Sequence, residues 1–149
     1  MAPDAVKVLA VGKLIVDPWQ SEVLNDWMGR TEDDVWSAPT CGLSVPRQNG
    51  KTLDTSGRIA SGMILYAEWV IYTAHLQKTA TETFMELRGL FESRGLRKYV
   101  KEIKAALGRE QIILKNGGRV VFVARTRNGG RGLHGDCLVF DEAQELTSE

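Results

Sequence analysis

Apolar residues along the chain fall into two kinds of spacing, and the two kinds alternate. Four stretches have apolar residues three or four positions apart, which predicts helices: residues 19–28, 50–66, 79–91 and 97–107. Three short runs are mostly apolar, which predicts buried strands: residues 40–45, 69–73 and 137–140. Strands that alternate with helices indicate an α/β fold with a mainly parallel sheet flanked by helices.

A β-hairpin is expected in addition to the parallel strands. Residues 111–114 and 119–124 are rich in β-branched side chains and flank a turn that contains Asn116 and Gly117. Asn-Gly between two such runs is the strongest short signal for a hairpin, because both residues tolerate the backbone angles of a tight turn. The length of 149 residues fits one domain with a real core.

Charge is balanced over the whole chain but not along it. Nineteen Lys and Arg face nineteen Asp and Glu, which excludes a protein that holds nucleic acid by bulk positive charge. Residues 94–131 nevertheless contain eleven basic and two acidic residues, a local charge of +9, and the last eighteen residues contain five carboxylates and no Lys or Arg. The lysines of the 97–107 helix are therefore either a solvated face or a surface for DNA.

The cysteines and the N-terminus suggest a compartment. Cys41 and Cys137 lie far apart and match no zinc pattern, so we expect two buried thiols in a reducing environment rather than a disulfide or a structural metal site. Asp4 interrupts the N-terminal apolar run, and nowhere do eighteen apolar residues stand together. We expect a cytoplasmic chain that does not enter a membrane.

A candidate phosphate-binding loop lies between the strand expected at 40–45 and the helix expected at 50–66. Gly50 would let the backbone approach phosphates, Lys51 would reach the terminal phosphates, and Thr52 would offer a hydroxyl to Mg²⁺. The first glycine of the usual G-x-x-x-x-G-K-[ST] pattern is replaced by Val45. Taken alone, Gly-Lys-Thr is more often a helix start with an exposed lysine.

An arginine inside this loop adds to the candidate chemistry. The guanidinium of Arg47 could bridge γ-phosphate oxygens or sense their loss. A simple surface arginine is the alternative interpretation.

Two carboxylates follow the strand expected at 137–140. Asp141 and Glu142 would lie at the carboxyl edge of a parallel sheet, where ligands bind in open α/β folds. Asp141 could hold Mg²⁺ through water, and Glu142 could orient and deprotonate an attacking water. The alternative is an acidic helix start that interacts with the helix dipole. Because both motifs occur in order, each at a strand end, the sequence favours a nucleotide hydrolase that uses ATP and Mg²⁺.

The chain resembles the ATPase half of large terminase subunits, the DNA-packaging motors of tailed double-stranded DNA bacteriophages. The resemblance spans nearly the whole chain and rests on these segments in order: residues 18–20, 45–52, 72–80, 123–127, 130–132 and 138–146. It implies a P-loop NTPase fold of the additional-strand, catalytic-glutamate class. Family members continue into a coupling motif and a nuclease domain, so residues 1–149 are expected to be the N-terminal part of the ATPase domain.

The resemblance also implies roles for individual residues. Gln20 would bind the adenine edge, the alternative being a solvated helix glutamine. Arg131 would be an arginine finger that reaches the nucleotide of a neighbouring subunit, the alternative being a solvated or DNA-binding arginine. The nucleotide would be contacted by Gln20, Arg47, Gln48, Asn49, Gly50, Lys51 and Thr52. The catalytic residues would be Arg47, Lys51, Arg131 and Glu142. The Mg²⁺ ligands would be Thr52 and Asp141.

A terminase motor implies particular partners. These would be viral double-stranded DNA, the portal protein, the small terminase subunit and further copies of the chain in a ring, in the cytoplasm of the infected bacterium and outside the mature virion. Two alternatives stay open: another DNA-translocating or helicase-like ATPase, or a nucleotide-binding assembly module that does not hydrolyse.

Overall fold

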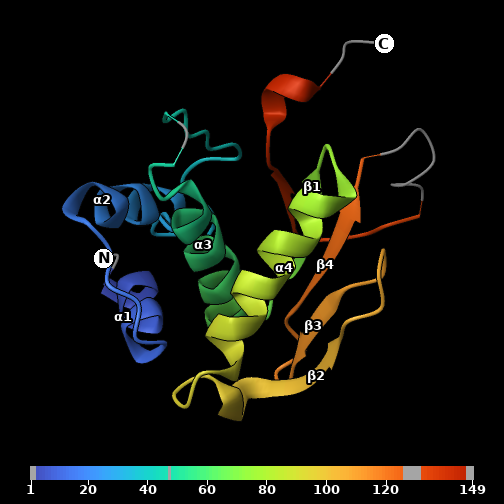
Figure 1. Ribbon diagram of the computed structural model, residues 1–149. Helices are drawn as coiled ribbons and strands as arrows, with labels where there is room; N and C mark the ends of the chain where they lie inside the picture. The colour runs from blue at the N-terminus through green and yellow to red at the C-terminus, as the bar shows by residue number, and fades with distance from the viewer. Residues whose placement is uncertain (1–2, 47, 126–131, 147–149) are drawn as a thin grey trace.

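A mixed five-stranded sheet is the centre of the fold (Figure 1). The structure is a computed structural model that describes residues 3–46, 48–125 and 132–146. In chain order the strands are β1 (Trp69–Ala74), β2 (Val100–Lys104), β3 (Gln111–Leu114), β4 (Arg119–Ala124) and β5 (Cys137–Phe140). Their order in the sheet is β2-β3-β4-β1-β5, so β2 and β5 are the edges.

The prediction of a mainly parallel sheet is wrong. β1 pairs in parallel with β4 and β5, but β3 pairs antiparallel with both β2 and β4. The β3–β4 hairpin was expected, whereas a 3₁₀ turn and β2 together occupy most of the segment expected as a helix at 97–107. The turn, Arg97–Tyr99, precedes β2.

A β-bulge explains why this strand has the spacing of a helix. The register of β2 against β3 shifts between Val100 and Glu102, and a bulge adds one residue to its strand. Val100 and Ile103, three positions apart, can therefore both pack against the core from one strand. Leu107, the third apolar residue of the expected helix, is exposed.

The strand expected at 40–45 is also absent from the described sheet. These residues form no regular element, and most of them are exposed. Gly42 weakens a strand, and Pro39 and Pro46 on either side lack the N–H that pairing needs. No described strand therefore leads into the Lys51 loop, and together with the mixed sheet this overturns the predicted P-loop fold of the additional-strand, catalytic-glutamate class.

The described helices lie on one side of the sheet (Figure 1). They are α1 (Pro3–Val11), α2 (Pro18–Trp27), α3 (Lys51–Tyr66) and α4 (Gln77–Glu92). Helices α3 and α4 pack against the strands, and α1 and α2 pack on α3. Helices α2, α3 and α4 match expected helices, but α1 was not predicted. No helix among the described residues is long and apolar enough to cross a membrane.

The core joins the helices to the sheet through aromatic side chains. The Tyr72 ring of β1 lies 5.3 Å from the Phe122 ring of β4, which in turn lies 5.5 Å from Phe84 of α4. The opposite face of the sheet is more open, since Leu138 and Phe140 of β5 are about half exposed. The thiol prediction is partly wrong, because Cys41 is exposed and Cys137 is half-buried.

Helix α3 contains two glycines where neighbours come close. A Cβ on Gly57 would lie 2.8 Å from Leu9 of α1, and a Cβ on Gly62 would overlap the carboxylate of Glu68. Glycine has a low helix propensity and therefore weakens α3, but the absence of a side chain allows α1 and Glu68 to pack closely against it.

A buried ion pair holds the middle of α3 to the start of β1. Arg58 Nη1 lies 2.6 Å from Glu68 Oε2, and Arg58 Nη2 lies 3.1 Å from Oε1. The same guanidinium lies 4.6 Å from the ring of Trp36, which contacts Tyr66 edge-on. The pair therefore ties α3 to both the sheet and the loop around Trp36.

Removing one partner of this pair is expected to destabilise the folded protein. Glu68→Ala leaves the Arg58 guanidinium buried without its counter-charge, which should lower the free energy of unfolding by about 3–5 kcal/mol. The control Glu92→Ala breaks the exposed pair with Arg88 and should change it by about 0.5 kcal/mol or less. Urea denaturation measures both, and equal losses would contradict a structural role for the buried pair.

Candidate functional site

The start of α3 presents backbone donors to solvent. Gly50 is the N-cap with φ 78°, and Gln48 also has a left-handed backbone with φ 64°. The residues before the helix, Gln48, Asn49 and Gly50, are all exposed. The first N–H groups of a helix have no intrahelical partner and attract anions. Arg47, predicted within this loop, lies outside the described residues.

Gln20 supports this loop from α2. Its side chain is 4% exposed, so the alternative of a solvated glutamine is wrong. Gln20 Oε1 accepts the Asp17 N–H at 2.9 Å, and Nε2 donates to the Gly50 carbonyl at 3.2 Å. The contact with adenine stays a prediction, and it requires the amide to exchange one of these backbone partners.

The two motifs predicted from the sequence meet. Lys51 Nζ lies 2.5 Å from Asp141 Oδ1, although ninety positions separate them in the chain. The reason is topological: β1, β4 and β5 are parallel, so their carboxyl ends share the edge of the sheet that faces the start of α3 (Figure 1). Only these three strands need to be parallel for the contact to form.

Asp141 is held by three donors. Besides Lys51, Oδ1 accepts the Glu142 N–H at 2.8 Å, and Oδ2 accepts the Tyr72 hydroxyl at 2.6 Å. Burial by itself raises the pKa of Asp141, but hydrogen bonds from Lys51 and Tyr72 and the charge of Lys51 outweigh it, so the pKa lies below its usual value. Asp141 is therefore an ionised carboxylate whose charge is paired with Lys51.

Tyr72 is a site residue that the sequence analysis missed. It is fully buried in β1, and its hydroxyl also lies 3.0 Å from Thr83 Oγ1. Burial raises the pKa of Tyr72, and the hydrogen bond to Asp141 raises it further, so the phenol stays a donor to the carboxylate. The available signal was the hydroxyl of Tyr72 on the face of the strand where its neighbours, Val70 and Ala74, are apolar.

Glu142 adopts an uncommon backbone next to Asp141. Its φ of 52° and ψ of 49° are left-handed, which costs a residue with a Cβ about 1–2 kcal/mol. Within the described residues its carboxylate makes no ion pair or hydrogen bond, and the residue is only partly buried. The carboxylate is thus open to act on a bound molecule.

The predicted Mg²⁺ ligands are chemically suitable but few. Among the described residues no group of three or more His, Cys, Asp or Glu could hold a metal ion. Mg²⁺ usually takes one or two protein ligands together with waters and substrate phosphates, so the number of predicted ligands, Thr52 and Asp141, suits this ion. Lys51 would have to leave Asp141 Oδ1 to admit the ion. Arg131, the predicted finger, lies outside the described residues.

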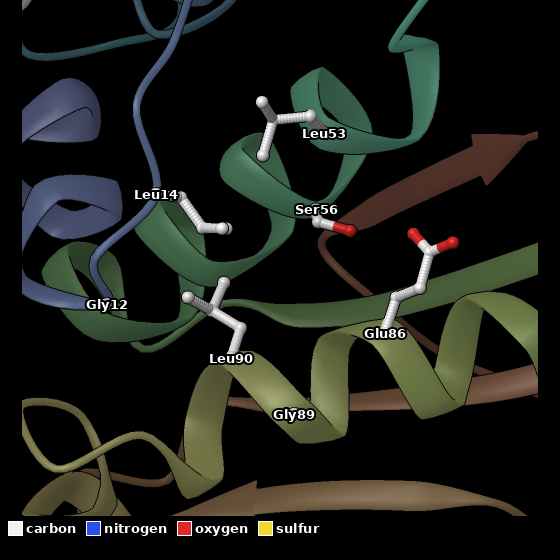
Figure 2. A pocket seen from close by; sticks show the side chains of 7 residues that line it. All are labelled: Gly12, Leu14, Leu53, Ser56, Glu86, Gly89 and Leu90. Atoms are coloured by element: carbon white, nitrogen blue, oxygen red, sulfur yellow. The ribbon is translucent and has the colours of Figure 1, made fainter. Parts of the chain in front are cut away.

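A mostly apolar cavity of about 340 Å³ lies elsewhere, between the end of α1, α3 and α4 (Figure 2). Its lining residues are Gly12, Leu14, Leu53, Ser56, Glu86, Gly89 and Leu90. None of the residues predicted for the nucleotide site lines it. The candidate site is therefore the polar edge around Lys51 and Asp141 rather than this cavity.

A buried carboxylate, Asp54, lies in the first turn of α3, directly after the exposed loop. Asp54 is 0% exposed, and neither of its oxygens has a hydrogen-bond partner within the described residues. Burial raises its pKa from 3.8 to about 6, and the nearby Gln20 amide lowers it only in part. The charged form is therefore disfavoured in the folded protein.

This carboxylate should make stability depend on pH. Because the pKa in the folded protein is about 6, protonation of Asp54 favours the folded state. This contribution to the free energy of unfolding is fully present below about pH 4 and is lost as the pH rises through 6. Asp54→Asn should therefore gain about 1–3 kcal/mol relative to the parent between about pH 4 and pH 7.5. Thermal unfolding across this range measures the gain, with the exposed Asp33→Asn as control. A difference that does not change with pH would contradict the raised pKa.

Comparisons of the chain with protein families, with curated proteins and with solved structures found no match.

Proposed function

We propose that this chain binds ATP with Mg²⁺ and hydrolyses it as part of a motor that moves viral double-stranded DNA into a procapsid. The observation that carries the proposal is the contact between Lys51 and Asp141 at the start of α3, with Glu142 beside it. The Lys51 ammonium and the N-terminus of α3 can bind phosphates. The neighbouring carboxylates of Asp141 and Glu142 can hold a metal ion and orient an attacking water, as phosphoryl transfer needs. The proposal rests on this local geometry and not on a P-loop sheet, because the sheet is mixed.

Binding would exchange one partner of Lys51 for another. The Lys51 side chain is 38% exposed. Its ammonium group would leave Asp141 and pair with the terminal phosphates, and the N–H groups at the start of α3 would donate to phosphate oxygens. Asp141 and Thr52 would then hold Mg²⁺. Bound Mg²⁺ would neutralise charge on the β- and γ-phosphates.

Glu142 would act on the attacking water. A carboxylate can accept the water proton as the oxygen attacks the γ-phosphate. Its position directly after Asp141 places the proposed base next to the proposed metal ligand. Arg131 would supply positive charge from a neighbouring subunit.

The partners follow from the resemblance to large terminase subunits. We propose double-stranded viral DNA, the portal protein, the small terminase subunit and further copies of this chain in a ring, in the cytoplasm of an infected bacterium. The excess of basic residues around β2 and β3 is compatible with a DNA partner.

One observation favours a second candidate, a nucleotide-binding assembly module without hydrolysis. Both oxygens of Asp141 are already bonded, Oδ1 to Lys51 and Oδ2 to Tyr72. If Lys51 stayed in place, Mg²⁺ would lack its carboxylate ligand. Steady-state ATP turnover by the isolated chain distinguishes the two candidates, because the module would bind ATP without releasing phosphate.

Lys51→Ala should weaken Mg-ATP binding about tenfold or more, since it removes a charged donor to the phosphates. Titration calorimetry measures the affinity. Lys101→Ala removes the same charge from exposed β2 and should leave the affinity unchanged. Parent-like affinity after Lys51→Ala would overturn the phosphate-binding assignment.

Glu142→Gln should keep Mg-ATP affinity within about threefold and slow hydrolysis about 10²–10⁴-fold, because the amide keeps the shape of the side chain but accepts no proton. Phosphate release under saturating ATP measures the rate. Turnover equal to that of the parent would place the general base elsewhere.

A further inference from the structure

The left-handed backbone of Glu142 needs a group that holds it in place. Residues with a Cβ adopt such angles only when their surroundings favour them. β5 ends at Phe140, so the carbonyls of Asp141 and Glu142 lie beyond the ladder that pairs β5 with β1. Their hydrogen-bond partners therefore decide the direction of the turn.

Arg125 supplies a partner for both carbonyls, and the Glu145 N–H gives the Glu142 carbonyl a second one at 3.0 Å. Arg125 follows β4 directly, and its own N–H bonds to the Ala74 carbonyl at the end of β1 at 2.8 Å. Its Nη1 donates to the Asp141 carbonyl at 2.8 Å, and its Nη2 donates to the Glu142 carbonyl at 3.0 Å. The guanidinium of Arg125, a half-buried residue, thus binds the backbone carbonyls of both Asp141 and Glu142.

The same guanidinium also reaches β1, which lies between β4 and β5. Arg125 Nη1 lies 3.2 Å from the Thr73 carbonyl, and that carbonyl also accepts the Asp141 N–H at 2.9 Å. Arg125 therefore ties together the carboxyl ends of three parallel strands. A planar guanidinium with several fixed donors can bridge such carbonyls, whereas the compact ammonium of lysine cannot span them in the same way.

We propose that Arg125 is a positioning residue that sets the direction of the Glu142 carboxylate toward the attacking water, and that it does so without touching the nucleotide. The proposal rests on the proposed ATP hydrolysis. It assigns Arg125 a role that differs from a DNA contact or a phosphate contact, because its guanidinium donors are directed at three backbone carbonyls and the Thr73 hydroxyl. Misplacement of a reacting group by about 1 Å can cost about 100-fold in rate.

The kinetic test uses Arg125→Lys, which keeps the charge but not the fork of donors. Turnover should fall about 10- to 100-fold while Mg-ATP affinity changes by about threefold or less. In a Glu142→Gln background, Arg125→Lys should cause no further loss, since the group that it positions is already inactive. Arg119→Lys, at the other end of β4 and stacked on Trp69, is the matched control and should behave like the parent.

A second measurement reports the contact without any nucleotide. Hydrogen exchange of the Glu142 amide, which bonds to Asp141 Oδ1, should be about tenfold faster in Arg125→Lys, whereas the Val120 amide within β4 should be unchanged. The comparison separates loss of the local turn from general unfolding of the sheet.

Three results would overturn the inference. A loss of affinity as large as the loss of turnover would make Arg125 a phosphate contact, and additive losses with Glu142→Gln would separate its action from Glu142. Unchanged exchange at Glu142 would show that Arg125 does not hold the turn. If the parent chain released no phosphate, the proposed function would fail and the positioning role with it, while faster exchange in Arg125→Lys would still identify the contact as structural.

Discussion

The ion pair between Lys51 and Asp141 is the interaction on which the candidate site depends. It joins the first residue of α3 to the residue that follows β5, and the Asp141 side chain is only 10% exposed. A partly buried pair of this kind is favourable only when further hydrogen bonds satisfy the charged groups. Tyr72 and the Glu142 N–H provide these bonds, so the carboxylate stays charged at the edge of the sheet.

A second set of contacts connects this pair to the rest of the helical layer. Gln20 bonds to the Gly50 carbonyl, and a Cβ on Gly50 would lie 2.9 Å from the Gln20 amide. The start of α3 is therefore fixed from two directions, by α2 through Gln20 and by the sheet through Asp141. Movement of Lys51 away from Asp141 would leave the Gln20 contact intact, because that contact involves the backbone before Lys51.

Sequence periodicity predicted the long elements and failed where tertiary contacts alter it. α2, α3, α4 and the β3–β4 hairpin were predicted, since their spacing and turn residues point to one structure. The bulge in β2 gives a strand the three-residue spacing of a helix. The segment at 40–45 contains apolar residues but lies exposed between prolines, and α1 depends on packing against Gly57, which no local pattern reveals.

The candidate site was predicted in part for a similar reason. Lys51 and Asp141 could be placed together because Lys51 begins a predicted helix and Asp141 follows a predicted strand. The strand expected before Lys51 is absent, but the three parallel strands still bring Asp141 to the start of α3 within a mixed sheet. Tyr72 and Arg125 act through contacts between strands that are distant in sequence, so their types alone did not show their roles. Asp54 could not be identified because its burial depends on how α2 packs over α3.

The two edge strands of the sheet, β2 and β5, differ in how accessible they are to an incoming strand. β2 carries exposed Lys101 and Lys104 and is kinked by its bulge, and charge and irregularity both discourage an incoming strand. β5 is only four residues long, but Leu138 and Phe140 are about half exposed on it. At high concentration, copies of the chain should therefore associate through the β5 edge. Leu138→Lys should raise the solubility of the protein far more than a lysine added on β2.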